Sequence, residues 1–214
     1  MHAYQQDFLD LAHAAGVLCF GNFTLKSGRE SPYFFNLGAI ASGDRLSRLG
    51  RSYAACIEAA GIGFDMLFGP AYKGIPLATA TAIALAQQHS RDVPLAYNRK
   101  EAKGHGEGGL IVGAALAGRV LIVDDVLTAG TAVRQSLALI RSAGATPAGV
   151  VIALDRQERG QGAHSAAQEL THDEGVPVLA IVGLAEIMDY VLARPGMASI
   201  SAALTAYRSH YGAD

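Results

Sequence analysis

The chain has 214 residues, of which 50% are apolar and 17% are charged, and its formal net charge is −2. This composition predicts one globular domain with a sizeable core and excludes wholesale disorder. The slightly acidic balance argues against a dedicated nucleic-acid-binding protein, and no apolar run approaches the roughly 18 residues of a membrane span. The first residues do not form a signal peptide, and two cysteines make neither a disulfide framework nor a metal set, so we expect a cytoplasmic protein.

Hydrophobic periodicity predicts helices that alternate with strands. Helices are expected at residues 4–15 and 44–60, with a hairpin between them at residues 17–36. Strands are expected next at residues 65–68, 93–97, 120–123, 148–154 and 176–182, and helices at residues 75–88, 131–143, from 184 and 198–207. This alternation is typical of an α/β fold, a central mostly parallel sheet with helices on both faces. Ligands bind beyond the carboxyl ends of such strands, so a site is expected in the loops that follow them.

The strongest chemical motif is the segment 120–132. Four apolar residues end abruptly at Asp124 and Asp125, and a turn of small residues with Thr128 and Thr131 leads into a helix. Backbone N–H groups, hydroxyls and the positive end of a helix suit a terminal phosphate, whereas the two acids suit sugar hydroxyls. The segment therefore predicts a ribose-phosphate site. A simple helix cap is the alternative, but adjacent acids after a buried strand are costly without partners.

A glycine-rich segment at residues 99–109 carries the cations Arg99, Lys100, Lys103 and His105. Residues 104–109 match G-x-G-x-x-G, but the match neither ends an apolar strand nor begins a helix, so a dinucleotide site is not expected. We interpret the segment as a mobile flap that excludes water and stabilises a departing anion such as diphosphate. A solvated charged loop is the alternative.

The segment 69–74 lies between a predicted strand and a predicted helix, and it contains Lys73. Its backbone amides and the Lys73 ammonium suit a diphosphate. An ordinary strand-to-helix turn is the alternative interpretation.

The segment 120–132 resembles the signature of the type I phosphoribosyltransferases, which bind 5-phosphoribosyl-1-diphosphate (PRPP). Within that family the resemblance narrows to the orotate phosphoribosyltransferases, through residues 23–29, 31–36, 69–76, 99–109 and 155–156 in the expected order. One departure is Gly104, where an acidic residue is expected. The resemblance covers essentially the whole chain. It implies transfer of the 5-phosphoribosyl group from PRPP to orotate, giving orotidine 5′-monophosphate and diphosphate in de novo pyrimidine (UMP) biosynthesis.

The resemblance also implies which residues form the site. Catalysis is assigned to Lys73, Arg99, Lys100, Lys103, His105, Asp124 and Asp125. PRPP binding is assigned to these residues together with Lys26, Tyr72, Val126, Leu127, Thr128, Ala129, Gly130, Thr131 and Ala132. Orotate needs an aromatic wall and a cation for its carboxylate, and it is assigned to Lys26, Phe34, Phe35, Thr128 and Arg156. A non-proline cis peptide, frequent in the family, is expected between Ala71 and Tyr72.

The same resemblance implies Mg²⁺, held mainly by substrate oxygens and water, and no metal site made of protein ligands. It also implies a homodimer that shares flap residues between subunits. From the net charge and the lack of a long apolar run, we expect binding to neither nucleic acid nor membrane. One domain is expected over residues 1–214, with a hood at about residues 1–40 and 155–170 and a flap at about residues 99–109.

Two other functions stay open at the level of the sequence. One is a phosphoribosyltransferase that acts on another base, because such an enzyme shares the sugar-phosphate site. The other is a regulatory protein that keeps this site without catalysis and binds RNA. The cationic flap and the net charge of −2 disfavour the regulatory function.

Overall fold

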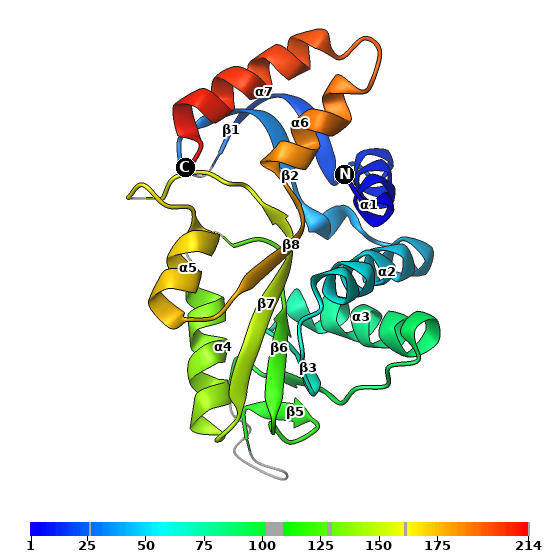
Figure 1. The fold of residues 1–214 in the computed structure, drawn as a ribbon, viewed down its shortest axis with the longest axis vertical. Helices are drawn as coiled ribbons and strands as arrows, with labels where there is room; N and C mark the ends of the chain where they lie inside the picture. The colour runs from blue at the N-terminus through cyan, green and yellow to red at the C-terminus, as the bar shows by residue number, and fades with distance from the viewer. Residues whose placement is uncertain (26, 102–108, 128–129, 161, 214) are drawn as a thin grey trace.

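The computed structural model describes residues 1–214 except for residues 26, 102–108, 128–129, 161 and 214 (Figure 1). Residues predicted for the site that lie outside the described part of the chain are Lys26, Lys103, His105, Thr128 and Ala129. The predicted flap is described only at its two ends, residues 99–101 and 109.

In the described part of the chain, six strands form the central sheet in the order β5-β4-β3-β6-β7-β8. They are β3 (Met66–Gly69), β4 (Leu95–Asn98), β5 (Ile111–Gly113), β6 (Arg119–Val123), β7 (Thr146–Asp155) and β8 (Val178–Gly183). Neighbouring strands are parallel except for β4 and β5, which are antiparallel. The predicted mostly parallel sheet is confirmed, and the edge strand β5 is an addition that the sequence did not predict.

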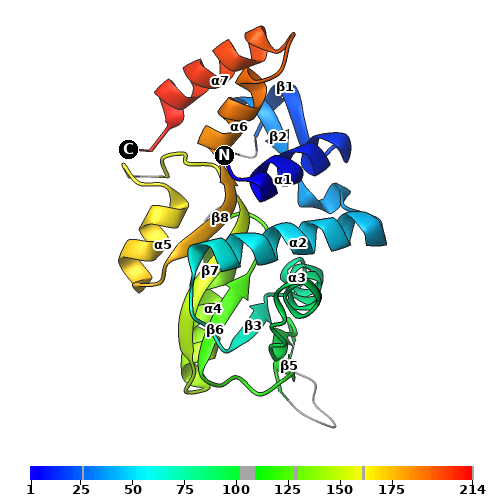
Figure 2. The same ribbon diagram turned by 45° about the vertical axis from the view of Figure 1, so that its right-hand side comes forward.

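Helices cover both faces of this sheet, as predicted (Figures 1 and 2). α2 (Gly43–Ala60) and α3 (Gly74–His89) cover one face, and α4 (Thr131–Ser142) and α5 (Ala166–Glu174) cover the other. Consecutive side chains of β6 point to opposite faces of the sheet, because side chains alternate along a strand. Leu121 therefore packs on the α2–α3 side and Ile122 on the α4–α5 side. Among the residues described, no helix has the length and apolar character needed to cross a bilayer.

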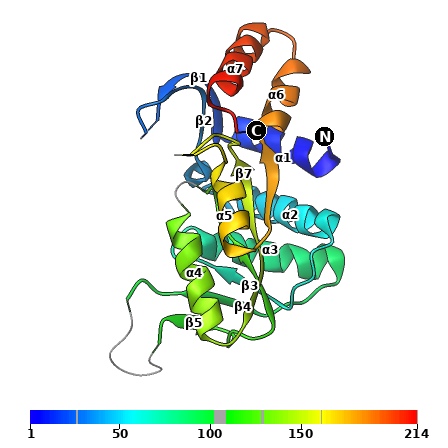
Figure 3. The same cartoon turned by 60° about the vertical axis from the view of Figure 1, so that its left-hand side comes forward.

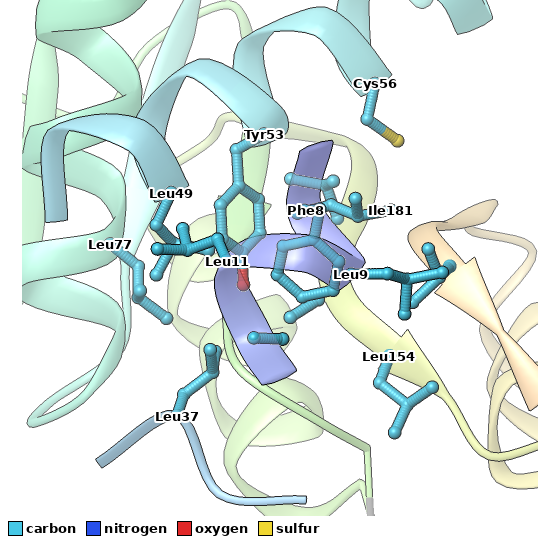
Figure 4. Close-up of a cluster of buried hydrophobic side chains, with 14 of the residues drawn as sticks. Phe8, Leu9, Leu11, Leu37, Leu49, Tyr53, Cys56, Leu77, Leu154 and Ile181 are labelled. Atoms are coloured by element: carbon cyan, nitrogen blue, oxygen red, sulfur yellow. The ribbon is translucent and has the colours of Figure 1, made fainter. Parts of the chain in front are cut away.

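The larger core lies where α1 (Ala3–Ala14) packs against α2 (Figure 4). Phe8, Leu49 and Tyr53 are each 1% exposed or less. Burying a side chain of this size stabilises the fold by about 2 kcal/mol. α2 begins at the cap Ser42, whose hydroxyl accepts a hydrogen bond from the Arg45 amide, and it ends where Gly61 adopts a left-handed φ of 63°. The core thus fixes α2 against the sheet, with the Tyr53 side chain extending away from the helix.

A smaller unit, the hood, stands at the end of the molecule beyond β7 (Figures 1 and 3). It consists of the antiparallel hairpin β1 (Leu18–Thr24) and β2 (Glu30–Phe35) with α6 (Leu184–Leu192) and α7 (Ala198–Tyr211), and the short 3-10 helix η1 (Leu37–Ala39) leads from it to α2. Tyr33 of β2 and Tyr207 of α7 pack edge to face, with ring centroids 6.0 Å apart. The sequence did not predict that α6 and α7 belong to the hood, and it did not predict α5, which lies beside the sheet.

The chain reverses its winding direction at the boundary between β3 and β6. From β3 it proceeds to β4 and β5 on one side, and it then returns to β6 on the other side of β3. In open α/β sheets, ligands bind in the crevice outside the carboxyl ends of the strands at such a switch point. The loops that follow β3 and β6 are therefore the first candidates for a site.

Candidate active site

The loop at residues 70–73 joins β3 to α3 and lies against the end of β6. Gly74, the first residue of α3, has no room for a side chain: a Cβ there would lie 2.4 Å from Pro70 Cδ and 2.9 Å from the carbonyl oxygen of Val123. Only glycine permits so close an approach between backbone segments. The fold therefore holds this loop at the crevice between β3 and β6.

The Asn98 side chain, at the end of β4, connects the same loop to the beginning of the predicted flap. The peptide bond between Ala71 and Tyr72 is cis, which confirms the expectation from the resemblance. The Ala71 amide donates to Asn98 Oδ1 at 2.9 Å, and Asn98 Nδ2 donates to the Arg99 carbonyl at 3.2 Å. The Lys100 ammonium lies 4.6 Å from the centroid of the Tyr72 ring, a cation–π contact. Asn98 thus links the 70–73 loop to the flap.

The predicted flap leaves the sheet between β4 and β5. The Arg99 amide donates to the Leu110 carbonyl at 2.7 Å, and Arg99 Nη1 donates to the Gly109 carbonyl at 3.3 Å. These bonds extend the β4–β5 pairing, so the two described ends of the segment are held together. Arg99 and Lys100 consequently lie next to the 70–73 loop.

Asp124 and Asp125 directly follow the buried strand β6. The Tyr53 hydroxyl donates to the Asp124 carbonyl at 2.7 Å, and the Asp124 amide donates to the Val151 carbonyl at 3.0 Å. Asp124 Oδ1 accepts a hydrogen bond from the Asp125 amide at 2.9 Å, and Asp125 Oδ1 accepts one from the Val126 amide at 2.8 Å. Each carboxylate is therefore oriented through its Oδ1 atom.

Lys73 and Asp125 join the two loops across the crevice. Their Nζ and Oδ2 atoms are 2.5 Å apart, and the Lys73 side chain is 60% exposed. The pKa of Asp124 is raised to about 6, chiefly by burial and also by the neighbouring Asp125 charge, although the Asp125 amide and the Lys73 ammonium favour the ionised form. The crevice thus combines an accessible cation with two acids, one of which titrates near neutral pH.

The turn between Asp125 and α4 has the features of an anion site. Leu127 is buried, and Gly130 adopts a left-handed φ of 68° immediately before α4. No side-chain hydrogen bond caps the described beginning of α4 at Gly130. The first N–H groups of a helix lack partners within the helix and lie at the positive end of its dipole, so those of Thr131 and Ala132 suit a phosphate.

The two predicted aromatic residues lie on β2 of the hood. Phe34 is 41% exposed, and its ring centroid is 5.6 Å from that of Phe23. Phe35 packs toward the core, with its ring centroid 6.3 Å from that of Phe8. Consecutive side chains of a strand point to opposite faces, so the two rings do not form one wall.

Arg156 follows β7 and lies beneath the hood. Its guanidinium carbon is 4.5 Å from the centroid of the Tyr33 ring, and Nη2 is 2.7 Å from a carboxylate oxygen of Glu158. The hood therefore holds this cation in place beyond the end of β7.

The structure brings two pairs of the described residues assigned to the site into contact and separates another pair. Lys73 contacts Asp125, and Lys100 contacts Tyr72, whereas Phe34 and Phe35 separate. Sequence reasoning missed the residues that position these groups: Tyr53, Asn98, Tyr33, Tyr207 and Glu158. Of these, Asn98 and Glu158 could have been identified from the sequence, since each lies within two residues of a predicted site residue at the end of a strand.

Residues 38–166 match the phosphoribosyl transferase domain. This range includes the loops after β3 and β6 and the end of β7. The fold and the site therefore define the chain as a phosphoribosyltransferase.

Comparison with known proteins identifies the group within this class. The chain is 58% identical to the orotate phosphoribosyltransferase of Cellvibrio japonicus over 214 residues, which cover all of both chains. The solved orotate phosphoribosyltransferase of Francisella tularensis is 41% identical with a TM-score of 0.88, covering 96% of this chain and 99% of that one. The Mycobacterium tuberculosis enzyme, solved in complex with PRPP, is 25% identical with a TM-score of 0.62, covering 85% and 98%. The chain belongs to the orotate phosphoribosyltransferases.

This membership decides between the functions left open by the sequence. The chain is an enzyme with orotate phosphoribosyltransferase activity, which transfers the phosphoribosyl group of PRPP to orotate in pyrimidine biosynthesis.

Proposed function

We propose that PRPP binds across the crevice between β3 and β6. Its diphosphate lies on residues 70–73, its ribose at Asp124 and Asp125, and its 5-phosphate on the turn at residues 126–132. The observation that carries this assignment is the 2.5 Å pair between Lys73 and Asp125, which brings a cation of one loop and an acid of the other within the span of one sugar. The Mycobacterium tuberculosis relative is solved in complex with PRPP, which supports PRPP as the ligand.

The cations of the site serve the leaving group. As the bond from the ribose carbon to the diphosphate oxygen breaks, negative charge builds on the diphosphate, and cations placed there in advance stabilise it. The residues assigned to this role are Lys73, Arg99, Lys100, Lys103 and His105. The Lys73 ammonium passes from Asp125 to the diphosphate as the ribose hydroxyls take up the carboxylate. Closure of the flap excludes water from the reactive sugar.

The acids serve the ribose. Loss of diphosphate makes the ribose carbon oxocarbenium-like, and Asp124 and Asp125 both hold the hydroxyls and stabilise the positive charge. A ring nitrogen of orotate donates the electron pair that forms the new bond to this carbon while diphosphate leaves. Because the pyrimidine is itself the nucleophile, the reaction needs no covalent enzyme intermediate.

Orotate is assigned to the space between the hood and the end of β7. The Arg156 guanidinium binds its carboxylate, because paired N–H donors match a carboxylate in geometry and charge. Phe34 is the ring of the aromatic pair that is open to a base, and Lys26 and Thr128 complete the predicted contacts.

The arginine assignment is tested by the variant Arg156→Ala. We expect the KM for orotate to rise by roughly 10- to 100-fold while the KM for PRPP changes little, because the lost charge contacts only the base. Steady-state assays that follow the PRPP-dependent loss of orotate absorbance measure both constants. Arg91→Ala is the matched control, since Arg91 pairs with Glu58 at 2.9 Å and neither residue is assigned to the site. Equal increases in both KM values contradict the assignment.

Magnesium fits this site as an ion carried by the substrate. It prefers hard oxygen ligands and keeps several waters. Asp124 and Asp125 supply carboxylate oxygens, but across the described residues no group of three or more His, Cys, Asp or Glu is placed to hold a metal. We therefore assign Mg²⁺ to diphosphate oxygens and water, where it neutralises the charge of the diphosphate.

We further propose a homodimer, and the outer side of α2 and α3 supports it. A largely apolar cavity of about 340 Å³ lies between these helices, lined among others by Leu46, Ile75 and Pro76. Ile83, at its edge, is 52% exposed. Ile75 and Pro76 lie in the first turn of α3, which begins where the 70–73 loop ends, so a second copy seated here lies close to the crevice. The occupant we assign to this cavity is therefore the partner subunit.

A further inference from the structure

The Arg156 guanidinium is held along one edge only. Nε and Nη2 both lie 2.7 Å from Glu158 Oε1, and Nη2 also lies 3.4 Å from the Tyr207 hydroxyl. The Tyr33 ring supports the guanidinium from one face, 4.5 Å from the guanidinium carbon. Within the described part of the chain, no hydrogen bond or ion pair engages Nη1. The contacts thus fix the plane of the guanidinium and leave its Nη1 donors for an anion.

Glu158 is itself fixed from two sides. From β1–β2, Arg29 Nη1 lies 3.4 Å from Glu158 Oε2, and the Tyr33 hydroxyl donates to Oε1 at 3.4 Å. From the carboxyl-terminal segment, Gly212 forms an antiparallel bridge with Glu158. The Glu158 side chain is only 11% exposed. This carboxylate therefore connects the hairpin, the end of the chain and Arg156.

The backbone between the two residues is shaped to bring them together. Gln157 adopts a φ of 52°, in the left-handed region that non-glycine residues seldom occupy. The Gln157 amide donates to Asp155 Oδ1 at 2.9 Å, and the Gln157 side chain accepts from the Ala185 amide at 3.1 Å. Such a conformation persists where its surroundings enforce it, and here it lets Arg156 and Glu158, two residues apart, form an ion pair.

Arg29 and Arg156 share the single carboxylate of Glu158, so this carboxylate does not fully neutralise the Arg156 guanidinium. The nearby Asp155 carboxyl interacts with Glu158 and forms no hydrogen bond or ion pair with Arg156 among the described residues. A cation that is not neutralised completely and is only partly exposed attracts an anion more strongly than one in bulk water.

We infer that Glu158 is a positioning residue for orotate: it fixes the Arg156 guanidinium so that Nη1 receives the substrate carboxylate. The inference rests on the proposed role of Arg156. Glu158 does not touch the substrate; it acts through the arginine.

The variants Glu158→Ala and Glu158→Gln test this role. Glu158→Ala frees the guanidinium, and we expect the KM for orotate to rise about tenfold or more, with kcat and the KM for PRPP changed less than about twofold, because misplacing a binding group by about 1 Å is costly. Glu158→Gln keeps an oxygen acceptor at the same place and is expected to recover most of the affinity. Glu58→Ala, which removes the exposed partner of Arg91, is the matched control and leaves both constants unchanged.

Calorimetric titration provides a readout that a merely structural role would not change. Orotidine 5′-monophosphate is expected to bind Glu158→Ala about tenfold more weakly, whereas uridine 5′-monophosphate, which lacks the carboxylate, binds it as it binds the wild type. In an Arg156→Ala background, Glu158→Ala is expected to have no further effect. Equal weakening of both nucleotides, or tighter orotate binding by Glu158→Ala, overturns the inference. If Arg156→Ala alone leaves orotate binding unchanged, the proposed role of Arg156 fails instead.

Discussion

At the carboxyl end of β6, burial raises the pKa of Asp124 from 3.8 to about 6. The fold therefore favours the protonated carboxyl group, and ionising it at pH 7.5 costs about 3 kcal/mol of folding free energy. Below pH 3.8 the group is protonated in the folded and the unfolded chain, so the cost is absent. It grows as the pH rises from 3.8 to about 6 and stays constant above. The enzyme thus retains an unfavourable charge where the ribose is expected to bind.

Asp124→Asn is consequently expected to stabilise the fold while it removes activity. The gain in the free energy of unfolding approaches about 3 kcal/mol at pH 7.5 and shrinks toward zero as the pH falls to 3.8, because the amide stays neutral throughout. Urea unfolding at several pH values measures the gain, and steady-state assays measure the loss of kcat/KM. Asp44→Asn, at an exposed position in the first turn of α2, is expected to show no such gain. A variant with full activity, or with no pH-dependent gain, contradicts this account of Asp124.

Residues of the site could be predicted where they lie within a contiguous motif. Lys73 and Asp125 belong to two such motifs, and the structure places them 2.5 Å apart. Tyr53 could not be predicted, because it is 71 residues from the Asp124 carbonyl that it contacts and lies on the buried side of an ordinary amphipathic helix. The separation of the Phe34 and Phe35 rings could not be predicted either, since it depends on which face of the hairpin packs against the core.

At the scale of elements, the junction of β3 and α3 depends on one glycine. Gly74→Ala would place a Cβ 2.4 Å from Pro70 Cδ, so the 70–73 loop must shift. We expect the variant to lose about 1–3 kcal/mol of stability and most of its affinity for PRPP. Thermal unfolding and the KM for PRPP measure the two effects. Gly162→Ala, at an exposed loop position where a Cβ would meet only Glu169 Oε1 at 3.9 Å, is the matched control and should be harmless. A fully active and stable Gly74→Ala protein contradicts the tight junction.

The elements that the sequence predicted best are those with a long or unambiguous pattern. The apolar strand β6 is found within one residue of its predicted start, and Gly61 ends α2 as predicted. The strand β5 was not predicted, because three residues that end in a glycine are too few to show a hydrophobic periodicity. The helix α5 was not predicted, although a capping box marks its start: the Ser165 hydroxyl accepts a hydrogen bond from the Gln168 amide.

At the scale of the whole molecule, the hood joins the two ends of the chain. The β1–β2 hairpin packs on α7, and Arg29 of the hairpin lies 5.1 Å from the ring centroid of Tyr211. A site beneath such a unit depends on residues from both ends. No local sequence pattern reports contacts of this kind, so the hood predicted from the sequence omitted α6 and α7.

The proposed dimer is tested by mixing two inactive chains. One carries Lys100→Ala and Lys103→Ala, and the other carries Asp125→Ala. If each site combines the flap of one subunit with the acids of the other, mixed dimers contain one intact site. Random mixing then restores roughly a quarter of the wild-type activity, because half of the dimers are mixed and one of their two sites is intact. Purified mixed dimers without any regained activity contradict sharing, and a monomer by analytical ultracentrifugation contradicts the dimer.

The proposed mechanism requires the turn beginning at Asp124 to hold the phosphorylated ribose. A crystal structure of the enzyme with orotidine 5′-monophosphate tests it most directly. We expect the ribose hydroxyls within hydrogen-bond distance of the carboxylates of Asp124 and Asp125, and the phosphate against the N–H groups at the start of α4. A nucleotide bound elsewhere, with that turn unoccupied, contradicts it.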